Sequence, residues 1–308
     1  MLLLWLAGLG LLQLSILRLW LPPRTRPPAL LCLEGDNGRA FVFSSRGGQA
    51  NPSCLKRNPS RNITNKETNV KSQEFESQRM NVRIPAGRAH LEGELILPAG
   101  AAGVVLFVHG SGSSRHSPRN QYVARVIRES GNGTLLFDLL TRVEEIEDNV
   151  TARLRFDIGL LAQRLADATR WVASQPETRH LGIGYFGSST GGGAALVAAD
   201  ALGQSVAAVV SRGGRPDLAG ESLPRVQAPT LLIVGEYDEV VIRLNEEALA
   251  RLQCEKELRI VPRATHLFEE PGALEEVARL AADWFKRYLP ASTESRKKVG
   301  ETEGGDIK

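Results

Sequence analysis

The sequence is poor in the residues that build disulfide frameworks and metal sites. Its 308 residues include three cysteines, Cys32, Cys54 and Cys254, and five histidines. No two cysteines form a C-x-x-C pair, and their wide spacing does not match a set of metal ligands. We therefore expect neither a disulfide framework nor a metal site, and the cysteine content favours a reducing, cytoplasmic location.

The chain also lacks an excess of charge of either sign. It has 38 basic and 35 acidic residues, for a formal net charge of +3, whereas a nucleic-acid-binding protein needs a concentrated basic surface. Apolar residues make up 42% and charged residues 24%, which is ordinary for a globular protein. These values predict a globular domain and give no reason to expect a nucleic-acid partner.

Residues 1–21, MLLLWLAGLGLLQLSILRLWL, form a long apolar run that Gln13, Ser15 and Arg18 interrupt. No basic residue precedes the run and no small-x-small cleavage site follows it, so it does not match a cleaved secretory signal. Two interpretations stay open. The run is either a membrane anchor, whose following positive charges would keep the remaining chain cytoplasmic, or a leader without function.

Composition divides the rest of the chain into three parts. Residues 22–79 are rich in Pro, Asn, Ser, Arg and Lys without sustained periodicity, which predicts a disordered linker. Periodic sequence begins near Met80, so we expect the catalytic domain over 80–291. Residues 292–308 are polar and charged and are predicted to be a solvated tail.

Strand-like and helix-like segments alternate within the predicted domain. Short apolar runs are typical of buried strands, and apolar residues at helical spacing indicate helices. This alternation predicts a doubly wound, mainly parallel α/β sheet. The predicted strands are 90–98, 104–108, 134–140, 181–186, 207–211, 230–235 and 258–262, and the predicted helices are 122–129, 154–173, 190–201, 244–252 and 274–289.

The pentapeptide GSSTG at residues 187–191 fits the pattern G-x-S-x-G, with Ser189 at its centre. It follows the predicted strand LGIGYF and opens an Ala-rich helix, as a nucleophile turn does. Glycines on both sides are required where a Cβ would collide with neighbouring backbone. The alternative is a Gly/Ser turn that only caps the helix, but the placement favours Ser189 as a nucleophile.

A serine hydroxyl needs a base that a carboxylate orients. His266 is the last histidine of the chain and the only one after Ser189, in a loop between the last predicted strand and helix. Asp238 directly follows the strand TLLIVG and is the preferred acid. Asp217, after the preceding strand, is the alternative, although its neighbours Arg215 and Pro216 suit a solvated loop better.

The sequence HGSG at residues 109–112 follows another buried strand. A glycine-rich loop in this position leaves backbone N–H groups free to bind an oxyanion. We therefore expect an oxyanion hole that combines the N–H of Ser111 with that of Thr190. His109 is expected to hold the loop by hydrogen bonds rather than to transfer protons.

These motifs, HGSG, LLFDLL, GYFGSSTGG, TLLIVGEYDEVV and RATHLF, resemble the α/β-hydrolase superfamily over about residues 82–289. In particular they resemble its dienelactone-hydrolase-like branch, which has no cap domain. The founding members of this branch use a cysteine nucleophile, whereas Ser189 occupies the turn here and no cysteine is near it. The dienelactone substrate is therefore not carried over, and the resemblance implies a carboxylic-ester hydrolase.

The loops predict an open site. Residues 212–228 are too few for a cap domain, and residues 141–156 are predicted to be a solvated loop. Arg212 and Arg215 could attract a substrate carboxylate, but solvated arginines are commoner. An open site favours short or accessible esters over long lipids.

These features together predict a serine hydrolase that cleaves small-molecule carboxylic esters through an acyl-enzyme. Ser189, His266 and Asp238 form the expected triad, and the reaction needs no cofactor. Acyl transfer, or cleavage of a thioester or amide, stays open because the same triad serves these reactions. A non-catalytic binding module with the same fold is the third alternative.

Overall fold

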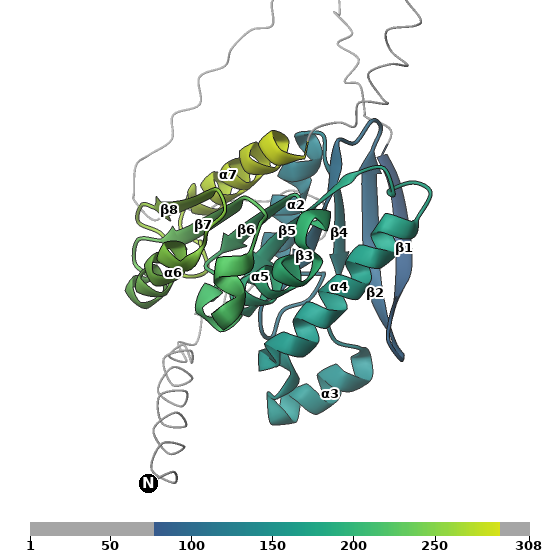
Figure 1. Ribbon diagram of the computed structural model, residues 1–308, viewed down its shortest axis with the longest axis horizontal. Coiled ribbons are helices and arrows are strands. Elements are labelled where there is room, and N and C mark those ends of the chain that lie inside the picture. The colour runs from purple at the N-terminus through teal and green to yellow at the C-terminus, as the bar shows by residue number, and fades with distance from the viewer. Residues whose placement is uncertain (1–76, 290–308) are drawn as a thin grey trace, which may run out of the picture. The chain divides into compact units, whose positions relative to one another are not determined.

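Eight strands form one sheet in the computed structural model, which describes residues 77–289 (Figure 1). Their order is β1-β2-β4-β3-β5-β6-β7-β8. β2 pairs antiparallel with β1 and β4, and every other neighbouring pair is parallel, so the strands from β4 to β8 end at one common edge. The strands are β1 (Ser77–Ala86), β2 (Ala89–Pro98), β3 (Gly103–Val108), β4 (Gly133–Phe137), β5 (Gly182–Ser188), β6 (Ala208–Arg212), β7 (Thr230–Gly235) and β8 (Lys256–Val261).

Helices cover both faces of this sheet, as the doubly wound prediction requires. Apolar side chains of α2 and α7 pack with one face of the sheet, and those of α4, α5 and α6 pack with the other (Figure 1). The mainly parallel α/β fold predicted from the sequence is therefore confirmed. The α-helices are α2 (Pro118–Glu129), α3 (Arg142–Thr151), α4 (Ile158–Ser174), α5 (Thr190–Leu202), α6 (Glu239–Arg251) and α7 (Ala273–Tyr288). Short 3₁₀ segments are η1 (Leu154–Phe156), η2 (Gly203–Ser205) and η3 (Pro216–Arg225).

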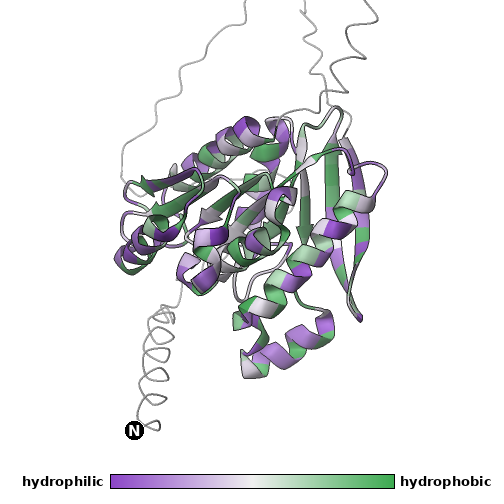
Figure 2. Ribbon diagram, viewed as in Figure 1, coloured by the Kyte–Doolittle hydropathy of each residue, from purple (hydrophilic) through white to green (hydrophobic). Residues whose placement is uncertain are grey.

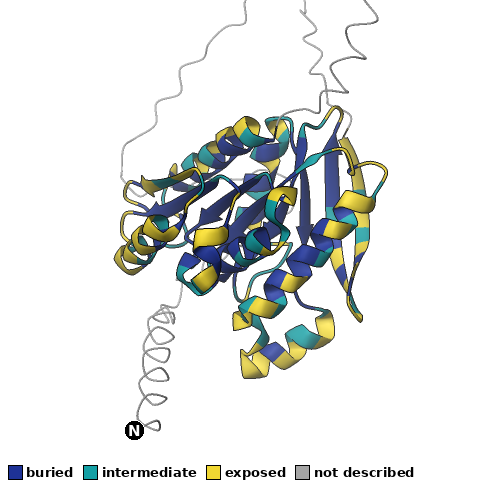
Figure 3. Cartoon of the chain, in the orientation of Figure 1, coloured by how far each residue is buried: buried dark blue, intermediate teal, exposed yellow. Residues whose placement is uncertain are grey.

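The central strands are buried on both sides, which explains their continuous apolar sequences. Every residue of β3, β4 and β7 is buried, and Figures 2 and 3 show these strands as the hydrophobic, buried centre of the domain. Strands with helices on both faces need apolar residues at every position. The edge strands β1 and β8 have exposed residues instead.

Two expectations at the margins of the sheet need correction. β1 begins at Ser77, which pairs with Pro98, so the strand extends into the end of the segment predicted as linker. Residues 142–151, predicted as a solvated loop, form the helix α3. Its capping box is complete, because the Thr141 hydroxyl accepts the Glu144 N–H at 3.3 Å and the Glu144 carboxylate accepts the Thr141 N–H at 2.7 Å.

The predicted anchor, most of the predicted linker and the predicted tail lie outside the described residues. Within residues 77–289, no helix is both long and apolar enough to cross a bilayer.

Candidate active site

The order in which successive strands are added to the sheet reverses between β3 and β5: β4 lies on one side of β3, and β5 and the later strands lie on the other. The connection after β3 leads to α2 on one face, whereas β5 leads to α5 on the other face. Ligands of open α/β sheets bind at the carboxyl edge beside such a switch point. The loop that follows β3 and the turn that follows β5 meet here, and these are the segments with HGSG and GSSTG.

Ser189 lies in a strained turn between β5 and α5. Its φ of 51° and ψ of −122° place it outside the regions that side-chain-bearing residues prefer. Its N–H donates to the Arg212 carbonyl at 3.2 Å, and its carbonyl accepts the N–H groups of Gly192 and Arg215, each at 3.0 Å. These bonds hold the turn in a conformation typical of a nucleophile turn at a strand-to-helix junction.

The glycines on both sides of this turn are sterically required. A Cβ on Gly191 would lie 2.1 Å from the Val108 carbonyl oxygen, and one on Gly187 would lie 2.6 Å from the Gly191 carbonyl oxygen. A Cβ on Gly110 would lie 2.9 Å from the Ser189 Cβ. The backbone of the HGSG loop therefore packs directly against the turn that holds Ser189.

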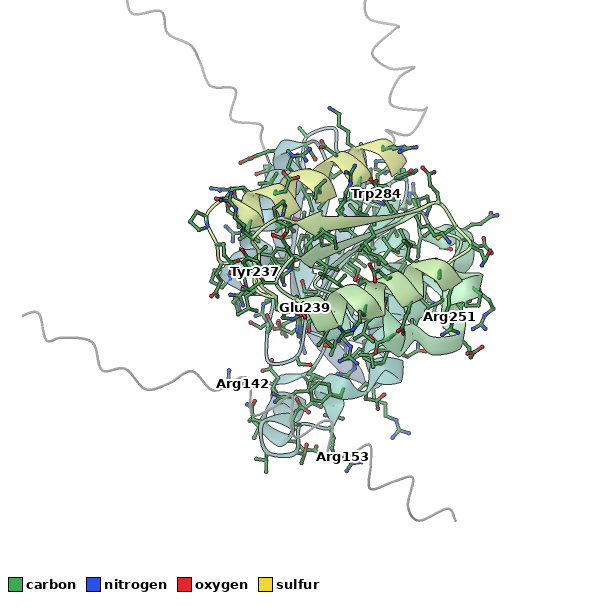
Figure 4. The ribbon with its side chains drawn as sticks, turned by 90° about the vertical axis from the view of Figure 1, so that its left-hand side faces the viewer. Arg142, Arg153, Tyr237, Glu239, Arg251 and Trp284 are labelled. Atoms are coloured by element: carbon green, nitrogen blue, oxygen red, sulfur yellow. The ribbon has the colours of Figure 1, made fainter. Side chains whose placement is uncertain are left out.

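His266 and Asp238 are in direct contact at the same edge. The His266 Nδ1 lies 2.6 Å from the Asp238 Oδ2, and both side chains are partly exposed. Asp238 is the N-cap residue of α6, three residues after the end of β7. Figure 4 shows its neighbours Tyr237 and Glu239 at the beginning of α6, with Arg251 at the other end. Asp217 instead makes two hydrogen bonds to the Arg215 guanidinium, at 2.8 and 2.7 Å.

The His266 imidazole lies close to the backbone that holds the Ser189 turn. A Cβ on Gly213 would lie 3.4 Å from the His266 Cε1 and Nδ1, and Gly213 follows the residue whose carbonyl accepts the Ser189 N–H. Within residues 77–289, no hydrogen bond joins the Ser189 hydroxyl to His266. Such contacts are often longer without substrate and tighten in the complex.

The predicted oxyanion donors, Ser111 and Thr190, are in contact with each other. The Ser111 N–H donates to the Thr190 Oγ1 at 3.1 Å, and the two hydroxyl oxygens are also 3.1 Å apart. The Ser111 hydroxyl is within 3.3 Å of the Arg155 carbonyl, to which it can donate. Thr190 is the first residue of α5, so its N–H has no carbonyl partner within the helix. Sequence reasoning missed the Thr190 hydroxyl as the resting partner of Ser111.

Two contacts tie the loop after β3 to the residues that directly follow β4. The buried His109 has its Nδ1 at 3.1 Å from the Gly110 carbonyl, and its Nε2 accepts the Leu139 N–H at 3.1 Å. Burial lowers the pKa of His109, which keeps the ring neutral and able to accept. Asp138 accepts the Arg115 N–H at 2.7 Å and also pairs with the Arg115 guanidinium. His109 therefore makes loop-holding hydrogen bonds, as expected.

A cavity of about 460 Å³ lies beside the HGSG loop. The HGSG loop, the first turn of α2, the end of β4 and the α3–η1 segment form its walls, and Figure 4 labels Arg142 and Arg153 in and after α3. Its lining includes Gly110, which packs against Ser189. The polar lining residues include basic ones, Arg119 and Arg155, and acidic ones, Glu145 and Asp148.

Within the part of the chain that the structure describes, no group of three His, Cys, Asp or Glu side chains could hold a metal ion. The one cysteine there, Cys254, lies between α6 and β8, at the edge of the sheet opposite Ser189. Burial raises the pKa of its thiol, which makes the reactive thiolate scarcer.

Comparison with known proteins identifies several relatives. The dienelactone hydrolase family matches residues 93–290. A dienelactone hydrolase from Anabaena variabilis is 61% identical with a TM-score of 0.68, and the match covers 69% of this chain and 99% of that one. The structure of Est1E from Butyrivibrio proteoclasticus is 14% identical with a TM-score of 0.58, covering 68% of this chain and 98% of that one, and this likeness concerns the fold alone.

Two Mycobacterium tuberculosis proteins are 58% identical over 209 residues and carry the provisional name phosphoribosyl transferase. The match covers 68% of this chain but 46% of theirs, so the chain spans about half the length of these relatives.

Proposed function

Because the chain belongs to the dienelactone hydrolase family, we propose that it is a serine hydrolase that cleaves carboxylic esters through an acyl-enzyme. The observation that carries this proposal is the His266–Asp238 contact of 2.6 Å beside the strained turn of Ser189. A base oriented by a carboxylate next to a nucleophile is the arrangement that activates a serine hydroxyl. The proposed substrate is a small-molecule ester met in the cytoplasm.

In the proposed reaction, the Ser189 hydroxyl attacks the ester carbonyl while the His266 Nε2 takes its proton. The C–O bond of the tetrahedral intermediate then breaks, and His266 gives the proton to the departing alcohol. Water attacks the acyl-serine with the same proton transfers, which releases the acid and restores Ser189. Asp238 keeps the proton of the neutral imidazole on Nδ1, so that Nε2 is free to accept.

The negative charge of the tetrahedral intermediate needs fixed donors. The proposed donors are the N–H groups of Ser111 and Thr190, and each such donor contributes typically about 2.7–4 kcal/mol to lowering the barrier. The Thr190 hydroxyl has to leave the Ser111 N–H before an oxyanion can bind there. Until then, the Thr190 hydroxyl keeps the Ser111 N–H hydrogen-bonded in the resting enzyme.

The name of the mycobacterial relatives, phosphoribosyl transferase, gives no reason to change this proposal. Those proteins are about twice as long as the matched region, and their name does not say which part carries the named activity. The hydrolase family match covers residues 93–290 of this chain, which contain the whole candidate site. Acyl transfer and cleavage of thioesters or amides use the same groups and remain outcomes of a substrate screen.

Labelling with a fluorophosphonate probe, followed by peptide mass mapping, tests the activated serine without a known substrate. We expect modification of Ser189 in the wild type and in His180→Ala, whose histidine is exposed at the other edge of the sheet. His266→Ala should not be labelled. A folded wild type that resists the probe would contradict the proposal and favour a binding module.

A further inference from the structure

The strand β8 lies at one edge of the sheet, at the end opposite β1 (Figure 1). Within residues 77–289, no strand pairs with its outer edge. On the inner edge, the carbonyl oxygens of Glu255 and Val261 accept N–H groups, at 2.8 and 3.0 Å, from the first residue of β7 and the residue that follows β7. Successive backbone groups of a strand point to alternate sides. The N–H and C=O groups that point to the outer edge are therefore those of Lys256, Leu258 and Ile260.

The outer edge of β8 combines charges of both signs with an exposed apolar side chain. Lys256 and Arg259 are exposed and Glu257 is partly exposed. Ile260 is 41% exposed. Unpaired backbone groups at a sheet edge are a template for another strand, and edge charges commonly prevent such pairing. They prevent pairing with a second copy of the same strand only where like charges lie opposite each other, so the register decides whether β8 repels its own copy.

The direction of the backbone groups limits the possible registers. In an antiparallel pair, residues whose N–H and C=O groups point outward lie opposite each other and exchange hydrogen bonds. The longest pairing of β8 with a second β8 that meets this condition has its two-fold axis at Leu258. Lys256 then lies opposite Ile260 of the second copy. Each Glu257 lies opposite Arg259 of the second copy, because the axis makes the two strands equivalent.

This register brings opposite charges together. Residues between the hydrogen-bonded pairs have their side chains closer across the strands, and Glu257 and Arg259 occupy such positions. Both lie on the same face of β8, where their side chains already form an ion pair of 2.6 Å. Two glutamates and two arginines would therefore alternate around the axis. A shift by two residues in either direction would instead place Glu257 opposite Glu257, or Arg259 opposite Arg259.

The ends of β8 fit the same register. Pro262 is the next outward position after Ile260 and has no N–H, so the pairing ends there. At the other end, the Lys256 ammonium donates to the Leu252 carbonyl at 2.5 Å, which keeps its charge on its own copy. The aliphatic part of the lysine side chain can then cover Ile260 of the second copy.

The other edge strand, β1, does not have this self-complementary pattern. It contains Arg79 and Arg83 and no acidic residue. Both arginines pair with glutamates of the neighbouring strand β2, Glu94 and Glu92. Since the charges of β1 itself have one sign, a second copy of β1 would bring like charges together.

We propose that β8 is an interface between two copies of this chain, which pair antiparallel about a two-fold axis at Leu258 and join their sheets into one. Backbone hydrogen bonds supply the attachment, and the Glu257–Arg259 pairs set the register. A pair of short strands is a small interface, so we expect a reversible dimer with a Kd in the micromolar range. This inference does not depend on the proposed hydrolysis.

Sedimentation velocity of the full chain, from about 1 to about 200 µM, tests the interface. Glu257→Arg leaves only positive charges around the axis, and Arg259→Glu leaves only negative charges on the same face. We expect each single variant to raise Kd by about 10-fold or more. The double variant with both substitutions exchanges the two charges and should return Kd to within about 3-fold of wild type.

An equimolar mixture of the two single variants is the sharpest form of this test. Each variant alone should be monomeric, whereas the mixture should associate, because positive and negative edges then face each other. A folding defect in either variant cannot produce this recovery. The matched control is Glu92→Arg, which reverses the charge of an exposed ion pair with Arg83 at the other edge of the sheet. This control should keep the Kd of wild type.

Three results would overturn the proposal. The first is a wild type that stays monomeric over the whole concentration range. The second is association of both single variants as strong as that of wild type, which would place the interface elsewhere. The third is a mixture, or a double variant, that fails to associate although circular dichroism shows it to be folded.

Discussion

The Thr190 hydroxyl oxygen accepts the Ser111 N–H at 3.1 Å. The residue that follows the proposed nucleophile thus occupies a donor that the proposed reaction needs for the oxyanion. The same side chain lies 3.1 Å from the Ser111 hydroxyl, so the resting site is a small network between the loop after β3 and the start of α5. In the proposed reaction, the oxyanion has to replace the Thr190 hydroxyl as the acceptor of the Ser111 N–H.

Thr190→Val tests whether the hydroxyl competes with the substrate. Valine has nearly the same shape but cannot accept the Ser111 N–H, so the donor is free before substrate arrives. A neutral hydrogen bond contributes about 0.5–1.5 kcal/mol, so we expect kcat/KM for a small ester to rise by about 2- to 10-fold. Thr190→Ser keeps the hydroxyl and should behave like wild type. A loss of activity in the valine variant would show instead that the hydroxyl helps to bind the oxyanion.

Gly191→Ala tests the steric requirement of the turn between β5 and α5. The added Cβ would lie 2.1 Å from the Val108 carbonyl oxygen, so the turn has to move away from β3. We expect a loss of about 1–3 kcal/mol in the free energy of unfolding, measured by urea denaturation, together with loss of esterase activity. Gly159→Ala is the matched control, because its Cβ would lie 3.5 Å from the nearest atom, the Asp157 Oδ1. That variant should be as stable as wild type or more stable.

Glu144→Gln tests how α3 is attached to the domain. The Arg164 guanidinium beside Glu144 lowers the pKa of that carboxyl to about 2. Because the folded pKa is lower than the unfolded one, this stabilisation is fully present above about pH 4.5 and is lost as the pH falls towards 2. We expect the variant to lose about 1–3 kcal/mol of unfolding free energy at pH 7, with allowance for partial exposure.

The difference between wild type and Glu144→Gln should shrink at pH 3. Glu129→Gln, on an exposed residue that ends α2, is the control and should differ little from wild type at either pH. A difference for Glu144→Gln that stays constant from pH 7 to pH 3 would contradict the assignment to this carboxylate.

The strands and the main helices could be predicted because their burial leaves a pattern in the sequence. β3 and β7 are apolar throughout, since helices cover both of their faces. The burial of α3 leaves no such pattern, because only Asp148 among its residues is buried and its apolar residues at helical spacing, Val143, Ile146 and Val150, are exposed. Its signal was the capping box from Thr141 to Glu144, which does not depend on packing.

The candidate site was predictable to the extent that its residues follow strands at the carboxyl edge of the sheet. The order of Ser189, Asp238 and His266 along the chain and their places after β5, β7 and β8 were visible in the sequence. The burial of Arg212 was not, because it depends on Asn120 and Phe268, which lie far away in the sequence. The contact between Ser111 and Thr190 depends in the same way on how two distant segments pack.

The choice of acid gives a further prediction, because Asp238 and Asp217 follow neighbouring strands and differ in their partners. Asp238 contacts the His266 Nδ1, whereas Asp217 accepts two hydrogen bonds from the Arg215 guanidinium. Asparagine in place of Asp238 cannot hold the proton of the imidazole on Nδ1 in the same way and stabilises the imidazolium less. We expect Asp238→Asn to lower kcat for ester hydrolysis by about 10³- to 10⁴-fold with the fold retained.

Asp217→Asn is the matched control for this prediction. It removes a carboxylate that also follows a strand of the sheet but leaves the contact with His266 unchanged. Circular dichroism should show both variants folded, and single-turnover kinetics with a 4-nitrophenyl ester should give nearly wild-type acylation for Asp217→Asn. If instead Asp217→Asn were the inactive variant, the imidazole would have to turn towards the loop after β6 during the reaction. The contact at 2.6 Å would then belong to the resting state alone.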